Sequence, residues 1–191
     1  MLAFMAVSCV GDDDTTLPSY DKLPLAQDFS TGADNTVLAT NGWLNYAEVG
    51  TALWKIQIYS SNGYAEFTSY QSGEASNVGW LISPEFTLEE GNARILTFDA
   101  SQSYVTSTAN KLEVLISSDF DGTDAGVATA TWVPLTATLP GTSATYFEFM
   151  SSGNISMAPY SGPLHVAFKV TGSGTNTALD GSYQIDNVII K

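Results

Sequence analysis

Basic residues are scarce in this sequence. It contains six Lys and Arg against 20 Asp and Glu in 191 residues, which gives a formal net charge of −14 at pH 7. A nucleic-acid-binding protein needs clustered cations to neutralise phosphates, so the sequence excludes that class. Attachment to an anionic membrane surface is disfavoured for the same reason. The acidic balance suits a protein that works outside the cell, or one with a site for a cation.

Cysteine and histidine occur once each, and long apolar runs are missing. Cys9 has no second cysteine to pair with, so no internal disulfide forms. No stretch approaches the ~20 apolar residues of a membrane-spanning helix. A Ser-His-Asp triad would need His165 as its base, and no acid flanks that residue. Nothing positions two carboxylates at a glycosidase separation. We therefore expect no catalytic residues and no enzyme, with a glycoside-type hydrolase as the least favoured alternative.

The first nine residues form a separate segment. Residues 1–7 are apolar, Ser8 is small, Cys9 follows it, and residues 12–14 are aspartates. This pattern resembles the cleavage box of bacterial lipoproteins, which implies a lipid on Cys9. The acidic run resembles the export signal of surface lipoproteins in Bacteroidetes-type bacteria. The apolar run is short and lacks a basic n-region, so we expect a truncated signal segment whose true start lies upstream. The alternative is an unstructured N-terminus with a chance cysteine.

The rest of the chain divides into a tether and a domain. Residues 10–22 are acidic and polar and predict a flexible tether. Residues 23–191 are long enough for one well-buried core and short for two. Hydrophobic residues make up 44% of the chain and charged residues 14%, so most of it can fold around a core.

Short alternation of apolar and polar residues dominates residues 23–191. Roughly ten segments alternate, and turn-forming residues separate nearly all of them. Leu164, Val166, Phe168 and Val170, for example, share one face of a strand. No window has a sustained helical period. The prediction is an all-β domain in which two antiparallel sheets pack as a jelly-roll β-sandwich. A closed barrel is the alternative.

Two stretches make specific structural predictions. Residues 53–70 predict a hairpin, because two alternating runs flank Asn62-Gly63, which accepts the positive φ of a type I′ turn. The run from Ser76 to Leu88 predicts a strand that Pro84 interrupts, since proline cannot donate to a ladder. We expect the chain to change sheets at Pro84 and Trp80 to fill the core. Residues 132–135 and 146–149 predict two short strands.

Four motifs occur in an order that resembles a known family: Asp28-Phe29-Ser30, Asn77-Val78-Gly79-Trp80-Leu81-Ile82-Ser83-Pro84, Leu112-Glu113-Val114-Leu115-Ile116-Ser117 and Tyr183-Gln184-Ile185-Asp186-Asn187-Val188-Ile189-Ile190. Over residues 23–191 the chain resembles the choice-of-anchor J and cleaved-adhesin domains of Bacteroidetes surface proteins. The resemblance implies a galactose-binding-like jelly roll, related in shape to MAM domains and to several carbohydrate-binding modules.

The same resemblance implies a structural calcium. Relatives of this architecture often hold the ion where the first and last strands meet, and Asp28 and Asp186 fall at the corresponding places. A hard cation needs several oxygen ligands, so Asp34 from the following loop is a further candidate. The alternative is that these side chains form ordinary hydrogen bonds and solvated turns. Residues 119–124 predict an Asp/Gly turn, because an EF-hand would need a Glu where Ala130 stands.

Aromatic residues crowd the first third of the domain. Exposed Trp and Tyr rings can stack on sugar rings while nearby amides bind the hydroxyls. The candidates for such a carbohydrate site are Trp43, Tyr46, Tyr59 and Tyr64. The alternative is that these rings fill a large β core.

Together these features predict a non-enzymatic lipoprotein of the bacterial cell surface. Cys9 would anchor it to the outer membrane, and its adhesin-like domain would bind glycans or host and neighbouring surface proteins. The second hypothesis is a carbohydrate-binding component of a glycan-uptake system, with the aromatic residues of the 43–70 region as its platform.

Overall fold

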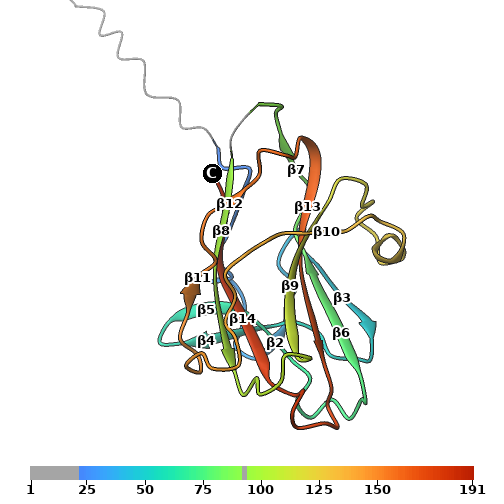
Figure 1. Cartoon of the computed structure of the whole chain (residues 1–191), viewed down its shortest axis with the longest axis vertical. Coiled ribbons are helices and arrows are strands. Elements are labelled where there is room, and N and C mark those ends of the chain that lie inside the picture. Colours follow the sequence, from blue (N-terminus) through green and yellow to red (C-terminus); the bar gives the residue numbers. More distant parts are fainter. Residues whose placement is uncertain (1–21, 92–93) are drawn as a thin grey trace, which may run out of the picture.

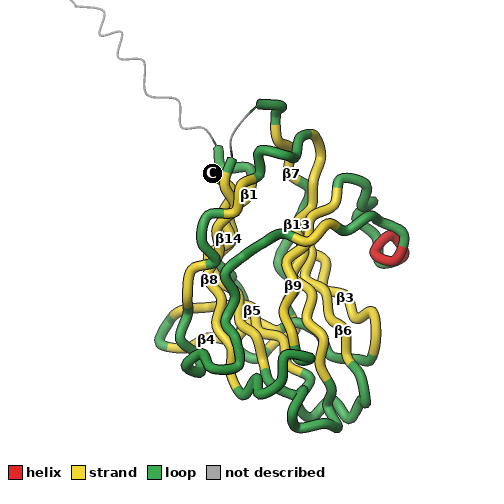
Figure 2. The backbone as a smooth tube through the Cα atoms, viewed as in Figure 1, coloured by secondary structure: helices red, strands yellow, loops and turns green. Residues whose placement is uncertain are grey.

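The computed structural model describes residues 22–91 and 94–191, whose strands form two antiparallel sheets packed as two layers (Figures 1 and 2). The expected all-β, two-sheet jelly-roll sandwich is confirmed. Cys9 and residues 10–21 of the expected tether lie outside the described residues. Within the described ranges the one helix is a short 3-10 helix, η1 (Ala125–Ala128), and no helix there is long and apolar enough to cross a membrane.

The larger sheet has eight strands, and the path β11-β8-β14-β5-β4-β2 sets its order, with β1 paired to β14 and β12 paired to β8. Its strands are β1 (Leu25–Gln27), β2 (Thr36–Val37), β4 (Lys55–Tyr59), β5 (Asn62–Thr68), β8 (Ile95–Ser103), β11 (Met150–Ser151), β12 (Ile155–Ser156) and β14 (Ser182–Ile190). The smaller sheet has six strands in the order β10-β9-β13-β6-β3, with β7 paired to β13. Its strands are β3 (Leu44–Val49), β6 (Asn77–Ile82), β7 (Phe86–Leu88), β9 (Lys111–Ser117), β10 (Val133–Pro134) and β13 (Gly162–Gly172).

The main core lies between the sheets. Leu164, Val166, Phe168 and Val170 of β13 are all buried in it, as their alternation predicts. Phe168 meets Phe98 of the opposite sheet edge to face, with ring centroids 5.1 Å apart. Each such ring removes a large apolar area from water, which contributes about 1.5–3 kcal/mol per side chain.

One glycine determines how closely the two sheets approach. Gly79 of β6 faces the core, and a Cβ there would overlap the ring of Phe67 from β5. Phe67 is fully buried and also packs against Trp54 at a centroid distance of 5.7 Å. The absence of a side chain at Gly79 therefore makes the space that the Phe67 ring occupies.

The interruption at Pro84 lies within one sheet. Both β6 and β7 pair with β13, so the predicted change of sheet at Pro84 is wrong. The gap is closed by side chains, since the Ser83 hydroxyl accepts a hydrogen bond from the Val166 amide (3.0 Å). The buried His165 donates from Nδ1 to the Ser83 carbonyl (2.9 Å), which occupies this ring nitrogen structurally.

A second hydrophobic cluster covers the outer face of the six-stranded sheet. Trp80 is buried, as expected, and it fills this outer cluster because the alternation of β6 turns Leu81 inward and Trp80 outward. The segment 118–132 closes over it, and the Trp132 ring packs at a tilt against that of Trp80, with ring centroids 5.1 Å apart. The Asp119 carboxylate fastens this segment by accepting hydrogen bonds from the Ser117 hydroxyl and the Thr131 amide, which lower the pKa of Asp119.

The predicted hairpin is confirmed as β4 and β5, with different turn residues. Tyr59 pairs with Asn62, so Ser60 and Ser61 form the two-residue turn, and both have positive φ (50° and 67°). Gly63 is needed for another reason. A Cβ at Gly63 would lie 2.7 Å from the carbonyl oxygen of Phe29, so the glycine allows the N-terminal segment to cross β5 closely.

Candidate functional site

Polar side chains form two rows across the outer face of the eight-stranded sheet. The register of β5, β14 and β8 aligns them as Glu66–Gln184–Ser101 and Thr68–Ser182–Ser103. The residues between the rows, Phe67 and Tyr183, point the other way into the main core. The strand period of two therefore places all six polar side chains on one face.

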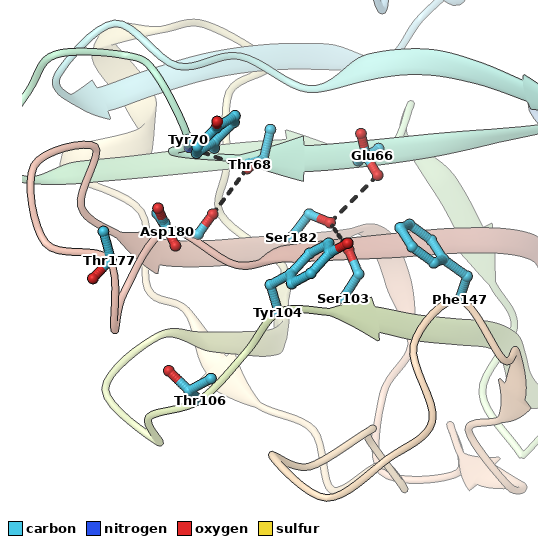
Figure 3. Close-up of a pocket in the computed structure, with 10 residues that line it drawn as sticks. All are labelled: Glu66, Thr68, Tyr70, Ser103, Tyr104, Thr106, Phe147, Thr177, Asp180 and Ser182. Carbon is cyan, nitrogen blue, oxygen red and sulfur yellow. Dashed lines mark hydrogen bonds between the residues drawn. The ribbon is translucent and has the colours of Figure 1, made fainter.

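Hydrogen bonds hold these side chains in fixed positions. Gln184 donates from Nε2 to Glu66 Oε2 (2.7 Å), and the Ser101 hydroxyl donates to Gln184 Oε1 (2.7 Å). The hydroxyls of Ser103 and Ser182 share a bond of 2.6 Å, and Ser182 reaches Glu66 at 3.4 Å (Figure 3). Gln184 and Ser101 are fully buried, so they act by holding the residues of the network that line a pocket, Glu66, Ser103 and Ser182, in fixed positions.

Two pockets lie on this face of the sheet, and four of the six polar residues line the first of them. The first, which we name the Tyr104 pocket, has a volume of about 540 Å³, and its ten lining residues include Glu66, Tyr70, Tyr104 and Asp180 (Figure 3). The second, the Tyr64 pocket, has a volume of about 620 Å³ and is lined by residues 59, 60, 62, 64, 147 and 149. Phe147 lines both, so we call the two pockets together the groove.

Aromatic rings stand exposed along the groove. Tyr59 is 75% exposed, Tyr104 61%, Tyr70 60% and Phe147 51%. The rings support one another, since the Tyr104 centroid lies 4.8 Å from Tyr146 and 6.5 Å from Phe147. In the Tyr64 pocket, Tyr64 and Phe149 meet edge to face at 5.5 Å. Such rings offer flat apolar surfaces to a ligand.

Two of these aromatic residues have a strained backbone. Tyr104 and Phe147 adopt φ values of 59° and 60°, a region that bulky L-residues rarely occupy. Such strained conformations persist only where the surrounding structure holds them in place, and strained residues are concentrated at functional sites.

A single buried residue links the two strained segments. The Gln102 carbonyl accepts a hydrogen bond from the Phe147 amide (2.8 Å). Its side chain accepts from the Val105 amide (3.0 Å) and donates to the Ala144 carbonyl (2.7 Å). Gln102 thus fixes the segment after Tyr104 and the segment before Phe147 at the same time.

The structure separates the four predicted carbohydrate residues. Tyr59 and Tyr64 lie together in the Tyr64 pocket. Trp43 is buried and meets Phe29 edge to face at 5.2 Å, as its core alternative required. Tyr46 lies on the outer face of the six-stranded sheet and packs against the Trp80 cluster.

Tyr70, from the predicted 43–70 region, lines the Tyr104 pocket, whereas the other groove aromatics come from segments that the sequence did not indicate. Residues 146–149 were predicted as a strand, but they form a turn and an irregular stretch before β11. Their Tyr-Phe-Glu-Phe sequence alternates like a buried strand, although Phe147 and Phe149 line the groove and Tyr146 packs against Tyr104. Tyr104 lies in a loop rich in Ser and Thr, and this composition predicts a polar loop without indicating a binding residue. An exposed aromatic within a polar loop is the signal that could have identified it.

The three predicted calcium ligands have separate roles. Asp28 is exposed and caps its own turn, accepting from the Ser30 amide (3.1 Å), and this bond lowers the pKa of Asp28. Asp34 accepts from the Ile58 amide (2.8 Å). Asp186 is buried and accepts from Asn62 Nδ2 (2.9 Å) and from the Asn187 amide (2.7 Å). Burial raises the pKa of Asp186, and nearby carboxylates add to the rise.

Within residues 22–91 and 94–191, no group of three Asp, Glu, His or Cys side chains converges to hold a metal ion. The carboxylates of Asp28, Asp186 and Asp34 therefore do not form a three-ligand site by themselves. Calcium binding stays a prediction.

Comparison with known proteins adds a family and a fold. A family model described as "Domain of unknown function (DUF5017)" matches residues 56–191. No curated protein matches the chain. Among solved structures, the chain is similar to the carbohydrate-binding module TmCBM61 in complex with beta-1,4-galactotriose, with a TM-score of 0.51 and 14% identity over 90% of this chain and 99% of that one.

The chain is also similar to cleaved adhesin domains. The K3 domain of Lys-gingipain from Porphyromonas gingivalis w83 has a TM-score of 0.52 and 17% identity over 89% of this chain and 99% of that one. The K2 domain of Lys-gingipain has a TM-score of 0.55 and 13% identity, over 87% and 97%. At these identities the likeness shows a shared fold, and it confirms the fold that the cleaved-adhesin resemblance implied.

Proposed function

The chain belongs to the DUF5017 family, and from this premise we propose that its sandwich is a non-catalytic module that binds a glycan in the groove. The family description states no function, so the proposal depends on the groove itself. The observation that carries it is the ordered row of polar side chains that lines the Tyr104 pocket, together with exposed aromatic rings along the groove.

The chemistry of a sugar matches this arrangement. A pyranose ring has an apolar face of C–H groups that stacks on an aromatic ring, and its rim carries hydroxyls that exchange hydrogen bonds. Tyr104 and Phe147 offer the rings in the Tyr104 pocket, while Glu66, Ser103 and Ser182 offer acceptors and donors beneath them. In the Tyr64 pocket, Tyr64 and Phe149 take the first role.

The comparisons support this proposal in one respect. A module of the same fold, TmCBM61, was solved with beta-1,4-galactotriose, so this type of sandwich holds a glycan in at least one other protein. We extend that ligand class to this chain on the strength of the groove, not of the 14% identity.

A glycan array followed by calorimetry at millimolar ligand tests the proposal. We expect binding by the intact chain, and a loss of about two- to tenfold in affinity for Tyr104→Ala and for Phe147→Ala, since one stacked ring contributes about 0.5–1.5 kcal/mol. Tyr46→Ala serves as the matched control, because this ring lies on the other sheet. Absence of binding to every glycan, or an equal loss in the control, would contradict the proposal.

The setting that we propose for this module is the bacterial surface. The lipobox-like sequence around Cys9 supports a lipid anchor in the outer membrane, and the choice-of-anchor J resemblance supports a role in adhesion or glycan uptake. Replacing Cys9 by Ala in the secreted full chain should move the protein from the membrane fraction to the medium. A membrane pool that does not change would reject the anchor.

A further inference from the structure

The charged side chains of the groove are all acidic. Glu66 and Asp180 line the Tyr104 pocket, and neither that pocket nor the Tyr64 pocket has a Lys or Arg among its lining residues. Within the described part of the chain, the ion pairs are Lys111–Glu113 and Lys169–Glu48, and both lie on the six-stranded sheet. Neither groove carboxylate is therefore neutralised by an ion pair there.

The cation nearest to Glu66 along the strands lines a neighbouring pocket with it but forms no ion pair with it. Lys55 of β4 pairs with Glu66 in the ladder, but its Nζ donates to Asn35 Oδ1 (3.2 Å). Glu66 instead receives amide donors, from Gln184 (2.7 Å) and Gln57 (3.2 Å). Amides fix the position of the carboxylate and leave its negative charge in place.

The pKa of the neighbouring Tyr64 is shifted in the direction that nearby negative charge favours. The pKa of the Tyr64 hydroxyl is raised, first by its burial and then by the charges of Glu66 and Asp34. A second negative charge is disfavoured at this position, whether it comes from a tyrosinate or from a ligand.

We propose that the groove selects uncharged glycans and rejects those that carry carboxylate or sulfate groups, with Glu66 and Asp180 as the selectivity-determining residues. The inference rests on the proposed function and names its ligand class. A neutral sugar donates its hydroxyl hydrogens to these carboxylates in charge-assisted bonds. A uronate or a sulfate ester places like charge against them, and a recognition site gains much of its specificity from such repulsion.

The test compares neutral and acidic glycans of otherwise equal structure. An array carries each neutral oligosaccharide beside its uronate or sulfated counterpart, and calorimetry then follows a β-1,4-galactan oligosaccharide and the same oligosaccharide oxidised at C6 to the uronate. At low salt we expect the acidic member of each pair to bind at least about tenfold more weakly. The gap should narrow as salt is raised, because salt screens the repulsion.

Asp180→Asn should also reduce the difference in affinity between neutral and acidic glycans, since it removes one groove charge and keeps the shape of the side chain. Glu113→Gln is the matched control, because it removes one charge from the six-stranded sheet, outside both pockets. In Glu113→Gln, the ratio of the affinity for the neutral glycan to the affinity for the acidic glycan should equal that of the unmodified chain.

The outcomes separate the two proposals. Acidic glycans that bind as tightly as their neutral partners, or a control that shifts the ratio as much as Asp180→Asn, overturn the selectivity and leave glycan binding intact. Failure to bind any glycan overturns the proposed function and this inference with it.

Discussion

The main-chain amide of Phe147 donates to the carbonyl of Gln102 across 2.8 Å, and this bond seats an aromatic residue with positive φ on the outer face of the eight-stranded sheet. The side chain of Gln102 fastens the segments on both sides of the groove at Val105 and Ala144. A residue with no exposure to a ligand thus determines where two exposed rings stand.

Removing the Gln102 amide should loosen both segments. Gln102→Leu leaves the Val105 amide and the Ala144 carbonyl without their partner, which should lower the free energy of unfolding by about 2 kcal/mol or more. Glycan affinity should fall as well, because Tyr104 and Phe147 lose their fixed positions. Urea denaturation and calorimetry measure the two effects. Gln27→Leu, the same change at the edge strand β1, is the control, and equal effects in both variants would contradict the role of Gln102.

The strain at Phe147 can be isolated with two variants that both remove the ring. Alanine retains the cost of a side chain at φ 60°, whereas glycine does not. We expect Phe147→Gly to be more stable than Phe147→Ala by up to about 1 kcal/mol in denaturant unfolding. Both should bind glycan equally poorly. An alanine variant that is the more stable of the two would show that the backbone is relaxed at this position.

The close approach of the two sheets at Gly79 predicts a third outcome. Gly79→Ala forces the new Cβ against the Phe67 ring, and overpacking of this kind costs about 1–3 kcal/mol of folding stability. Gly141→Ala is the control, since a Cβ there meets nothing within 4 Å and the φ is not positive. Thermal unfolding of the two variants measures the difference. Similar melting temperatures would mean that Phe67 has room to move.

Asp186 predicts how stability depends on pH. Burial raises its pKa in the folded state, so the protonated form is favoured by folding. Its contribution to stability is present at low pH and is lost as the pH rises from the ordinary value of 3.8 through the raised folded value. Asp186→Asn should flatten this part of the stability curve, measured by urea unfolding across pH. If the free energy of unfolding of Asp186→Asn depends on pH as steeply as that of the unmodified chain, other carboxylates cause the dependence.

Calcium would reverse that sign, because a bound cation favours the ionised carboxylate. If Asp28, Asp34 and Asp186 help to hold calcium, the melting temperature at pH 7 should rise between chelator and excess calcium in the unmodified chain and stay constant in Asp186→Asn. A melting temperature of the unmodified chain that does not move would remove the prediction.

The fold could be predicted from the sequence because burial of one face of a strand makes apolar and polar residues alternate. Leu164, Val166, Phe168 and Val170 occupy alternate positions, and the structure buries all four between the sheets. The same rule failed where both faces of a strand are covered. Trp80 and Leu81 are both buried, so the pattern could not tell which of them faces the main core.

The groove was less accessible, because it joins residues that are distant along the chain. Glu66, Ser103 and Ser182 meet only through the strand order β5-β14-β8, which no local pattern encodes. Phe147 alternates with its neighbours as a core residue would, and its exposure follows from a turn held by Gln102.

The positions of the tryptophans have a practical consequence for spectroscopy. All four, Trp43, Trp54, Trp80 and Trp132, belong to or pack against the two hydrophobic clusters, and none lines the Tyr104 or the Tyr64 pocket. Their emission should therefore change when the sandwich unfolds and stay nearly silent when a sugar enters the groove. The coupled pair Trp80 and Trp132, at 5.1 Å, further offers a near-ultraviolet dichroism signal for the outer cluster alone. One sample can thus report folding through indole optics while ligand occupancy is followed separately by heat or by tyrosine resonances.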